Sequence, residues 1–250
     1  MRRMTYFVMA LALVLGFTQC KKEQMPANNQ TEGIRITLDV NGGNSNSRVI
    51  VDPTGNNGQY NYATVNFESG DVIYVGYNNA YVGTLTYSNG TFSGSVNIDS
   101  YDGIKPLHFY FLGGVGFTPT IDETNNTATV NISNQTTKYP VISYAPSKQA
   151  FTGEGAYSAK LQNKVSIMKF NVDTPSTSAI CITGMNNKVT LTFNPEAEET
   201  DDGFTYGMDG NGVIKMHGVT SSNTETWAVV LPQDEYTKAK IGRASCRERV

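Results

Sequence analysis

The residues from Phe67 to Ile98 constrain the fold more than any other part of the chain; they are FESGDVIYVGYNNAYVGTLTYSNGTFSGSVNI. Between Val72 and Tyr77, successive side chains fall on opposite faces, which is the two-residue period of a β-strand. Asn78-Asn79 and Asn89-Gly90 then interrupt the β-rich runs, and Asn-Gly between such runs is the strongest local signal for a two-residue hairpin turn. The stretch therefore predicts three consecutive antiparallel strands.

Strand patterns of the same kind continue along the chain, with turn signals roughly every 8–12 residues, as in a β-sandwich. Ile34–Val40 alternates apolar and polar residues and predicts a half-buried first strand, whereas LHFYFL at 107–112 is continuously apolar and predicts a central strand. No helical period is sustained after the N-terminal leader, so the predicted fold class is all-β. Further strands are predicted at 48–51, 127–132, 141–144, 165–172, 212–216 and 226–231, and a hairpin is predicted at 179–193 around Met185-Asn186-Asn187.

The turn-rich segment PSKQAFTGEGAY at 146–157 predicts a junction between two domains. We expect an N-terminal β-sandwich at 34–150 and a C-terminal one at 151–240, the second incomplete because no convincing final strand follows 226–231. The last residues, IGRASCRERV at 241–250, are rich in arginine in a chain that is otherwise poor in it. They resemble translated adapter sequence and are expected to be non-native; a native basic tail is the alternative.

The N-terminus carries the pattern of an export signal. Arg2 and Arg3 precede an apolar run, YFVMALALVLGF at 6–17, which is shorter than the roughly 20 apolar residues that span a bilayer. Cys20 follows this run and resembles the cysteine of bacterial lipoprotein signals, which becomes the acylated first residue of the mature chain. We expect a signal peptide at 1–19, a lipid anchor on Cys20 and a flexible tether at 20–33. An unmodified cysteine after an ordinary cleaved signal is the alternative.

Charge and side-chain chemistry argue against several classes of function. Between Cys20 and Lys240, 14 basic residues accompany 21 acidic ones, a net charge of −7 that disfavours nucleic acid as a partner. His108 and His217 lack the neighbours of a zinc site or a general base, and no nucleophile motif or phosphate loop stands out. Neither an enzyme nor a cofactor is expected. The acidic cluster at 196–202 offers oxygen ligands for Ca²⁺ but lacks EF-hand spacing, so a solvated loop is favoured.

Three segments together resemble the fimbrillin-like surface lipoproteins of Bacteroidota-type bacteria. They are the hairpin stretch with LHFYFLG behind it, TETWAVVLPQ at 224–233, and the leader sequence FTQCKKE at 17–23. The family comprises major and minor fimbrial subunits and tip proteins. The resemblance implies two transthyretin-like Greek-key β-sandwich domains, anchoring to the outer membrane at the cell surface, and assembly into fimbriae that serve adhesion.

The resemblance also implies how subunits would assemble. An arginine-specific protease removes an N-terminal strand, and a strand donated by another fimbrial subunit fills the groove that is left. Arg48 lies beyond the first predicted strand, after a loop rich in asparagine and glycine, so cleavage there would release Ile34–Val40 as a unit. Arg35 lies inside the strand and is the poorer candidate. An uncleaved, solvated Arg48 is the alternative.

A surface lipoprotein that binds glycans is the alternative function, with a host or glycan receptor as its partner. Tyr77, Tyr81 and Tyr87 are candidates to stack on sugar rings, provided that they share an exposed face. The even spacing of Tyr81 and Tyr87 places both on one face of a regular strand. Ordinary strand aromatics are the competing interpretation.

Overall fold

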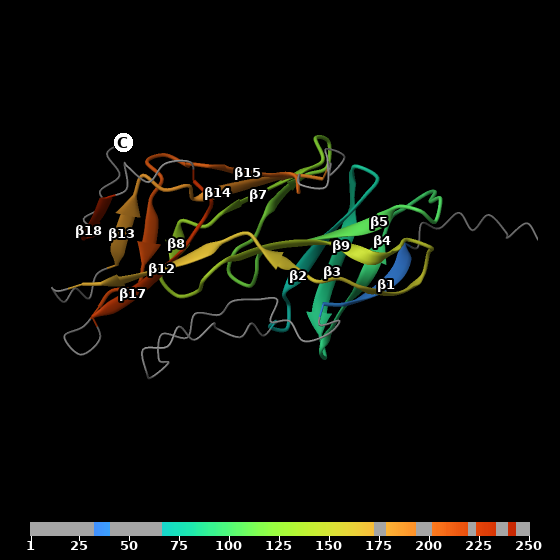
Figure 1. Ribbon diagram of the computed structural model, residues 1–250, viewed down its shortest axis with the longest axis horizontal. Helices are drawn as coiled ribbons and strands as arrows, with labels where there is room; N and C mark the ends of the chain where they lie inside the picture. Colours follow the sequence, from blue (N-terminus) through green and yellow to red (C-terminus); the bar gives the residue numbers. More distant parts are fainter. Residues whose placement is uncertain are drawn as a thin grey trace, which may run out of the picture. The chain divides into compact units, whose positions relative to one another are not determined.

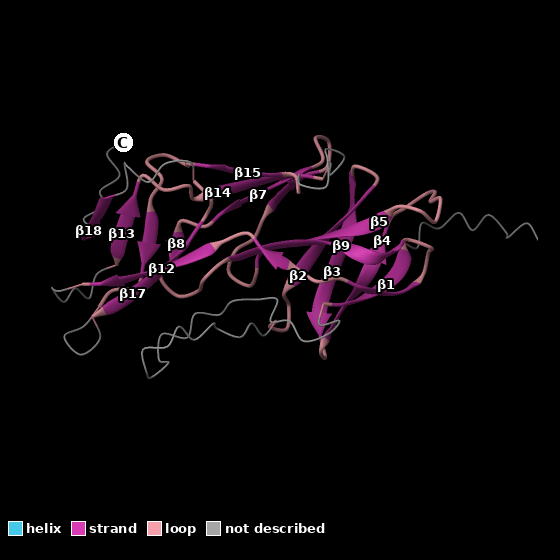
Figure 2. Ribbon diagram, in the orientation of Figure 1, coloured by secondary structure: helices cyan, strands magenta, loops and turns pink. Residues whose placement is uncertain are grey.

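Every regular element of the described residues is a β-strand, which confirms the predicted all-β class (Figure 2). The computed structural model describes residues 33–40, 67–172, 179–193, 202–219 and 224–233, together with the backbone of 240–243. Within these ranges, no helix is long and apolar enough to cross a membrane. The leader, the tether as far as residue 32, Cys20, Arg48 and the predicted strand at 48–51 lie outside the described residues, as do residues 244–250.

The predicted double hairpin is present. Both central residues of each turn have positive φ, as a type I′ turn requires: Asn78 (47°) and Asn79 (64°), then Asn89 (51°) and Gly90 (89°). One irregularity interrupts the pairing of the first two strands, because Val75 pairs with Gly83 and the next residue, Gly76, pairs with Tyr81. The skipped residue is a β-bulge, which shifts the alternation of faces. The three strands are β2 (Val72–Tyr77), β3 (Ala80–Ser88) and β4 (Thr91–Val96).

These strands belong to an eight-stranded sheet with the order β10-β1-β4-β3-β2-β5-β9-β11 (Figure 1). The segment that contains β10 and β11 joins its two edges. β10 pairs in parallel with β1, while the Ser147–Ala159 bridge and β11 pair with β9. The sheet therefore closes on itself. The strands not yet bounded are β1 (Ile34–Asp39), β5 (Pro106–Gly113), β9 (Val141–Ala150), β10 (Gly155–Ser158) and β11 (Gln162–Asn163).

The closed sheet surrounds the first hydrophobic core, and β5 shows why its sequence is apolar throughout. Leu107, Phe109 and Phe111 enter the first core, whereas Tyr110 and Leu112 enter a second core on the opposite face. A strand that is buried on both faces reads as a continuous apolar run. The predicted central strand is thus confirmed, with β2 and β9 as its neighbours.

Three smaller sheets accompany the large one. Sheet β15-β14-β7-β6 packs against the large sheet through the second core, and sheet β18-β13-β16-β8 packs against the pair β12–β17 through a third core. Their bounds are β6 (Thr120–Asp122), β7 (Thr127–Asn131), β8 (Asn134–Gln135), β12 (Ser166–Asn171), β13 (Ile180–Thr183), β14 (Lys188–Thr192), β15 (Phe204–Gly207), β16 (Ile214–Met216), β17 (Glu225–Val230) and β18 (Lys240–Arg243).

The hairpin predicted at 179–193 is wrong. β13 pairs with β16 and β18, whereas β14 pairs with β7 and β15, so the two strands lie in different sheets. Met185 and Asn187, which the prediction placed at the turn of the hairpin, are each 1% exposed. The connection carries the chain from one sheet to the other because Met185 enters the third core and the Asn187 amide binds inward.

The expected division at residue 150 does not follow the pairing of the strands. β7 and β8 precede that residue but pair with β14 and β16 from the later half, and β6 joins the same sheet as β14 through β7. Conversely, β10 and β11 follow it and complete the large sheet. Sequence order therefore does not separate the sheets into two consecutive halves.

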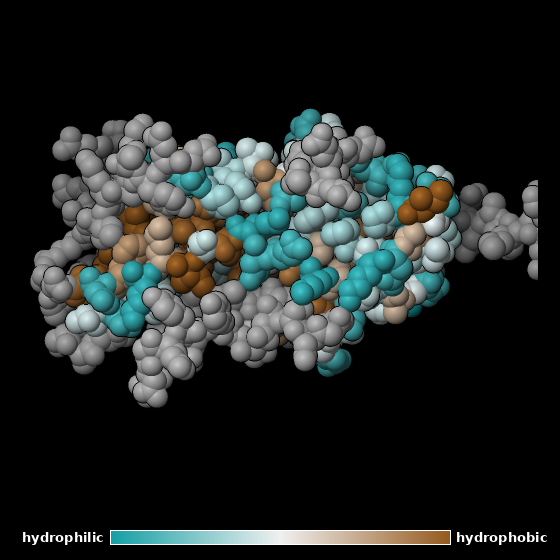
Figure 3. Space-filling view, viewed as in Figure 1, coloured by the Kyte–Doolittle hydropathy of each residue, from teal (hydrophilic) through white to brown (hydrophobic). Residues whose placement is uncertain are grey.

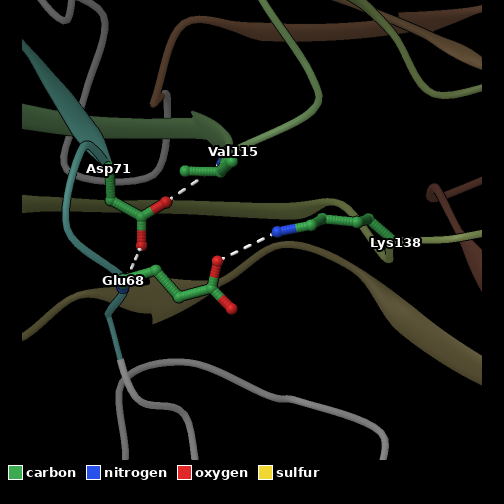
Figure 4. A network of polar contacts seen from close by, with 4 residues as sticks. All are labelled: Glu68, Asp71, Val115 and Lys138. Carbon is green, nitrogen blue, oxygen red and sulfur yellow. Dashed lines mark hydrogen bonds and ion pairs between the residues drawn. The ribbon is translucent and has the colours of Figure 1, made fainter.

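A buried carboxylate fixes the start of β2 (Figure 4). Asp71 is fully buried and accepts hydrogen bonds from the backbone N–H groups of Glu68 (2.8 Å) and Val115 (3.1 Å). Its own carbonyl accepts a bond from the N–H of Tyr87 (2.8 Å), and Glu68 forms an exposed ion pair with Lys138 (3.0 Å). Asp71 thus connects the loop before β2, the loop after β5 and strand β3 through hydrogen bonds.

The third core is covered less completely than the first by the described residues. Met168, Phe170 and Val172 pack against it but are only partly buried. Figure 3 shows hydrophobic surface over β12 and β13, whereas the surface over the large sheet is mainly hydrophilic on the same face.

Candidate functional site

The first strand lies between two other strands, and this position makes it the candidate functional site. β1 is antiparallel to β4, where Ile36 pairs with Gly94 and Leu38 with Phe92. On its other side it is parallel to β10, where Ile36 pairs with Gly155. Removing β1 would therefore leave a groove with an unpaired backbone edge on both sides.

The side chains of β1 alternate as the sequence predicts. Ile36, Leu38 and Val40 are at most 3% exposed and belong to the first core, while Arg35 is exposed on the opposite face. Each such buried aliphatic side chain contributes roughly 1.5–3 kcal/mol. The backbone is held as well, because the carbonyl of Asp39 accepts a bond from the N–H of Ala159 (3.1 Å). β1 is thus an integral part of the core.

On its C-terminal side, β1 is joined to the rest of the sheet through one segment of the chain. Along the chain, the strand reaches the next described residue, Phe67, only through residues 41–66, which contain Arg48. A single cut in that segment would leave β1 held by hydrogen bonds and side-chain burial alone. Arg35, the other candidate cleavage site, pairs with Ser95 inside the ladder, and a protease needs an unpaired extended backbone.

The three tyrosines proposed as a glycan-stacking surface do not meet on one face. Tyr77 is 5% exposed and its ring centroid lies 5.5 Å from that of Phe151 in the first core. Tyr87 packs on Phe92 at the same core, whereas Tyr81 packs on Phe193 at the second core. The even spacing of Tyr81 and Tyr87 misleads here because the bulge in β3 lies between them.

His108 and Tyr144 form a polar contact on the face of the large sheet that lies opposite the first core. His108 Nδ1 lies 2.8 Å from the hydroxyl oxygen of Tyr144, and their rings stack with planes 4° apart. Burial lowers the pKa of His108 to about 4, and burial raises the pKa of Tyr144 to about 12. The pKa of Tyr206 is also raised, mainly by burial and to a smaller extent by the negative charge of Asp202. Asp202 forms an ion pair with Lys164, with 2.6 Å between Oδ2 and Nζ. We therefore interpret the contact between neutral His108 and Tyr144 as part of the packing of the sheet and not as a site for chemistry.

Metal ligation finds no support in the described part of the chain, where no three histidine, cysteine or carboxylate side chains converge. Cys181 lies buried in β13. His217 accompanies Tyr139, with 3.1 Å between Nδ1 and the hydroxyl oxygen. The acidic cluster at 196–201 lies outside the described residues.

Neither a protein-family model nor a curated protein matches this chain. Solved structures resemble it at low identity. A candidate cell adhesion protein from Bacteroides uniformis is 11% identical with a TM-score of 0.48, over 85% of this chain and 79% of its own. One from Bacteroides ovatus is 15% identical with a TM-score of 0.45, over 85% and 86%. A candidate polysaccharide-binding protein from Bacteroides thetaiotaomicron is 10% identical with a TM-score of 0.35, over 71% and 70%. Similarity at this level assigns neither a family nor a function.

Proposed function

We propose that this protein is a cell-surface adhesion lipoprotein, anchored to the outer membrane through Cys20, that assembles with other fimbrial subunits by exchange of its first strand. The observation that supports this most is the position of β1 between β4 and β10, with its covalent link confined to residues 41–66. No catalytic role is proposed.

Cleavage alone would not empty the groove. Three buried aliphatic side chains and two ladders hold β1, so a cut strand would stay bound until another strand displaces it. Strand displacement retains most of the hydrogen bonds throughout, because each incoming residue replaces an outgoing one. A donor strand must therefore carry apolar residues at alternate positions to fill the sites of Ile36, Leu38 and Val40.

The test begins with an arginine-specific protease acting on the folded chain. We expect mass spectrometry to find a cut after Arg48 and none after Arg35, and Arg48→Ala to abolish it. The cut protein is then incubated with a fluorescent peptide of residues 33–40. We expect slow incorporation of this peptide with simultaneous release of the native strand, and none for a peptide carrying Leu38→Asp. An uncut Arg48, or a cut protein that incorporates neither peptide, would refute the proposal.

A further inference from the structure

A cleft of about 570 Å³ lies where β1 begins, and it is separate from the groove that β1 fills. Its volume falls within the roughly 300–1,000 Å³ of small-molecule sites, and its lining is mainly polar. β1 forms one wall, and the loops that precede β5 and β10 form the other. The lining residues are Gly33, Ile34, Arg35, Tyr101, Gly153 and Glu154.

Tyr101 is the exceptional side chain of this cleft, because it is 46% exposed and yet held in place. One side of its ring packs edge-on against the fully buried Phe151, with centroids 4.9 Å apart and planes at 69°. Its hydroxyl lies over Gly153, where an added Cβ would come within 2.7 Å of the hydroxyl oxygen. The exposed part of the ring is therefore a fixed aromatic platform.

The loops that carry the platform are also fixed. Asp102 accepts bonds from the N–H groups of Ile104 (2.9 Å) and Lys105 (3.3 Å), and these bonds lower the pKa of its carboxyl group. On the facing loop, the hydroxyl of Tyr157 donates to the carbonyl of Gly153 (2.7 Å). A ligand entering the cleft would thus order little of the protein, which reduces the cost of binding.

Charge favours a neutral ligand rich in hydroxyl groups. Arg35 and Glu154 are both exposed in the cleft, so it offers guanidinium donors and carboxylate acceptors together. Because one cation and one anion line the cleft, the attraction of either side chain for a charged ligand is opposed by the repulsion of the other. Hydroxyl groups can donate to one and accept from the other.

From these observations we infer that the β1 cleft binds a neutral hexose unit of a glycan, with the apolar face of the sugar stacked on Tyr101 and its hydroxyl groups bonded to Arg35 and Glu154. The tyrosine ring provides contact area at low cost in conformational entropy, since it is already immobile. The site goes beyond the proposed assembly function, and it requires β1 in place because Arg35 belongs to that strand.

The test uses the full chain carrying Arg48→Ala, so that strand exchange does not affect the outcome. Saturation-transfer NMR is recorded with maltose and lactose, and with galacturonic acid and glucosamine as charged comparisons. We expect at least one neutral disaccharide to bind, Tyr101→Ala to raise its Kd about tenfold or more, and Tyr101→Phe to change it less than about threefold. Ile104→Ala is the matched control, because Ile104 lies on the same loop, is 77% exposed and does not line the cleft.

The proposal is overturned if neither disaccharide binds, if Tyr101→Ala binds as tightly as the parent, or if the charged sugars bind better than the neutral ones. Thermal unfolding of each variant establishes that it is folded, and Glu154→Gln, at an exposed side chain, gives a second variant expected to weaken binding without altering the fold. Cleavage at Arg48 is measured separately, so the assembly proposal and the glycan proposal fail independently.

Discussion

The side-chain amide of Gln135 bonds to both backbone groups of Val229: the Val229 N–H donates to Oε1 at 2.7 Å, and Nε2 donates to the Val229 carbonyl at 2.8 Å. Nε2 also donates to the carbonyl of Ile132 (3.0 Å). Gln135 and Val229 are each 1% exposed. The Gln135 side chain therefore satisfies two backbone groups of β17 that would otherwise need a residue of a neighbouring strand as their partner.

Gln135→Met should lower the free energy of unfolding by about 2–4 kcal/mol, because it leaves two buried backbone groups of Val229 without partners. Urea unfolding followed by circular dichroism measures this. Gln149→Met is the control, since Gln149 is exposed and its side chain bonds at the surface, to the carbonyl of Ala156 and to the Ser158 hydroxyl. An unchanged urea midpoint for Gln135→Met would contradict the assigned role.

Asn187 should tolerate no change in its amide group. Its Nδ2 donates to Ser133 Oγ (3.0 Å) and to the carbonyl of Val213 (3.1 Å), and its Oδ1 accepts from the N–H of Asp209 (2.6 Å). Asn187→Asp removes the donors and buries a charge, so we expect a loss of about 3 kcal/mol or more.

The matched control for Asn187 is Asn89→Asp, in an exposed turn whose positive φ aspartate also adopts. That variant should stay within about 0.5 kcal/mol of the parent. If the two aspartate variants were equally stable, the buried hydrogen bonds of Asn187 would not hold the crossing between sheets.

Replacing Asp71 should cost much more stability than replacing Lys138, although both belong to one network of polar contacts (Figure 4). Asp71→Ala leaves the N–H groups of Glu68 and Val115 without their acceptor and should cost about 2–3 kcal/mol. Lys138→Ala removes an ion pair whose side chains are 45% and 51% exposed, and should cost less than about 1 kcal/mol. Amide exchange at Val115 should accelerate only in Asp71→Ala, and acceleration in both variants would disprove the distinction.

His108 should make stability depend on pH. Its pKa is about 4 in the folded protein and roughly 6.5 in the unfolded chain, so between these values the unfolded state binds the extra proton. Stability is therefore full above the unfolded pKa and falls as the pH drops toward the folded one, by about 2 kcal/mol near pH 5.

His108→Gln has no proton to take up, and it should lose correspondingly less stability between pH 7 and pH 5. Urea midpoints of both proteins at the two pH values give the comparison, in which the ordinary carboxylates of the two proteins cancel. Parallel pH dependence in the parent and in His108→Gln would show that burial of His108 is not the cause.

Much of the local structure could be predicted because its causes are local. The turns at Asn78-Asn79 and Asn89-Gly90 follow from residues that accept positive φ, and the register of the hairpins follows from those turns. The alternation in β1 predicts which of its side chains enter the core. The bulge in β3 escaped prediction, because a single extra residue leaves no period in the sequence, and the position of the tyrosines depended on it.

The partners of the later strands could not be predicted. A turn of Met185-Asn186-Asn187 between two β-rich runs is locally compatible with a hairpin, and the burial of Met185 and Asn187 becomes visible only beside Ser133, Asp209 and Val213. The role of Tyr101 could not be predicted for the same reason, since its ring packs against Phe151 and Gly153, which are about fifty residues away.

The sequence by itself determined that the chain is all-β, where most strands begin and end, and which face of β1 is apolar, because side-chain alternation and turn chemistry act over a few residues. The tertiary structure alone decided that β1 lies between β4 and β10, that β13 and β14 part into different sheets, and that Arg35, Tyr101 and Glu154 line one cleft. These relationships depend on hydrogen bonds and packing between residues far apart in the chain, and a strand's own sequence carries no record of which edge it will meet.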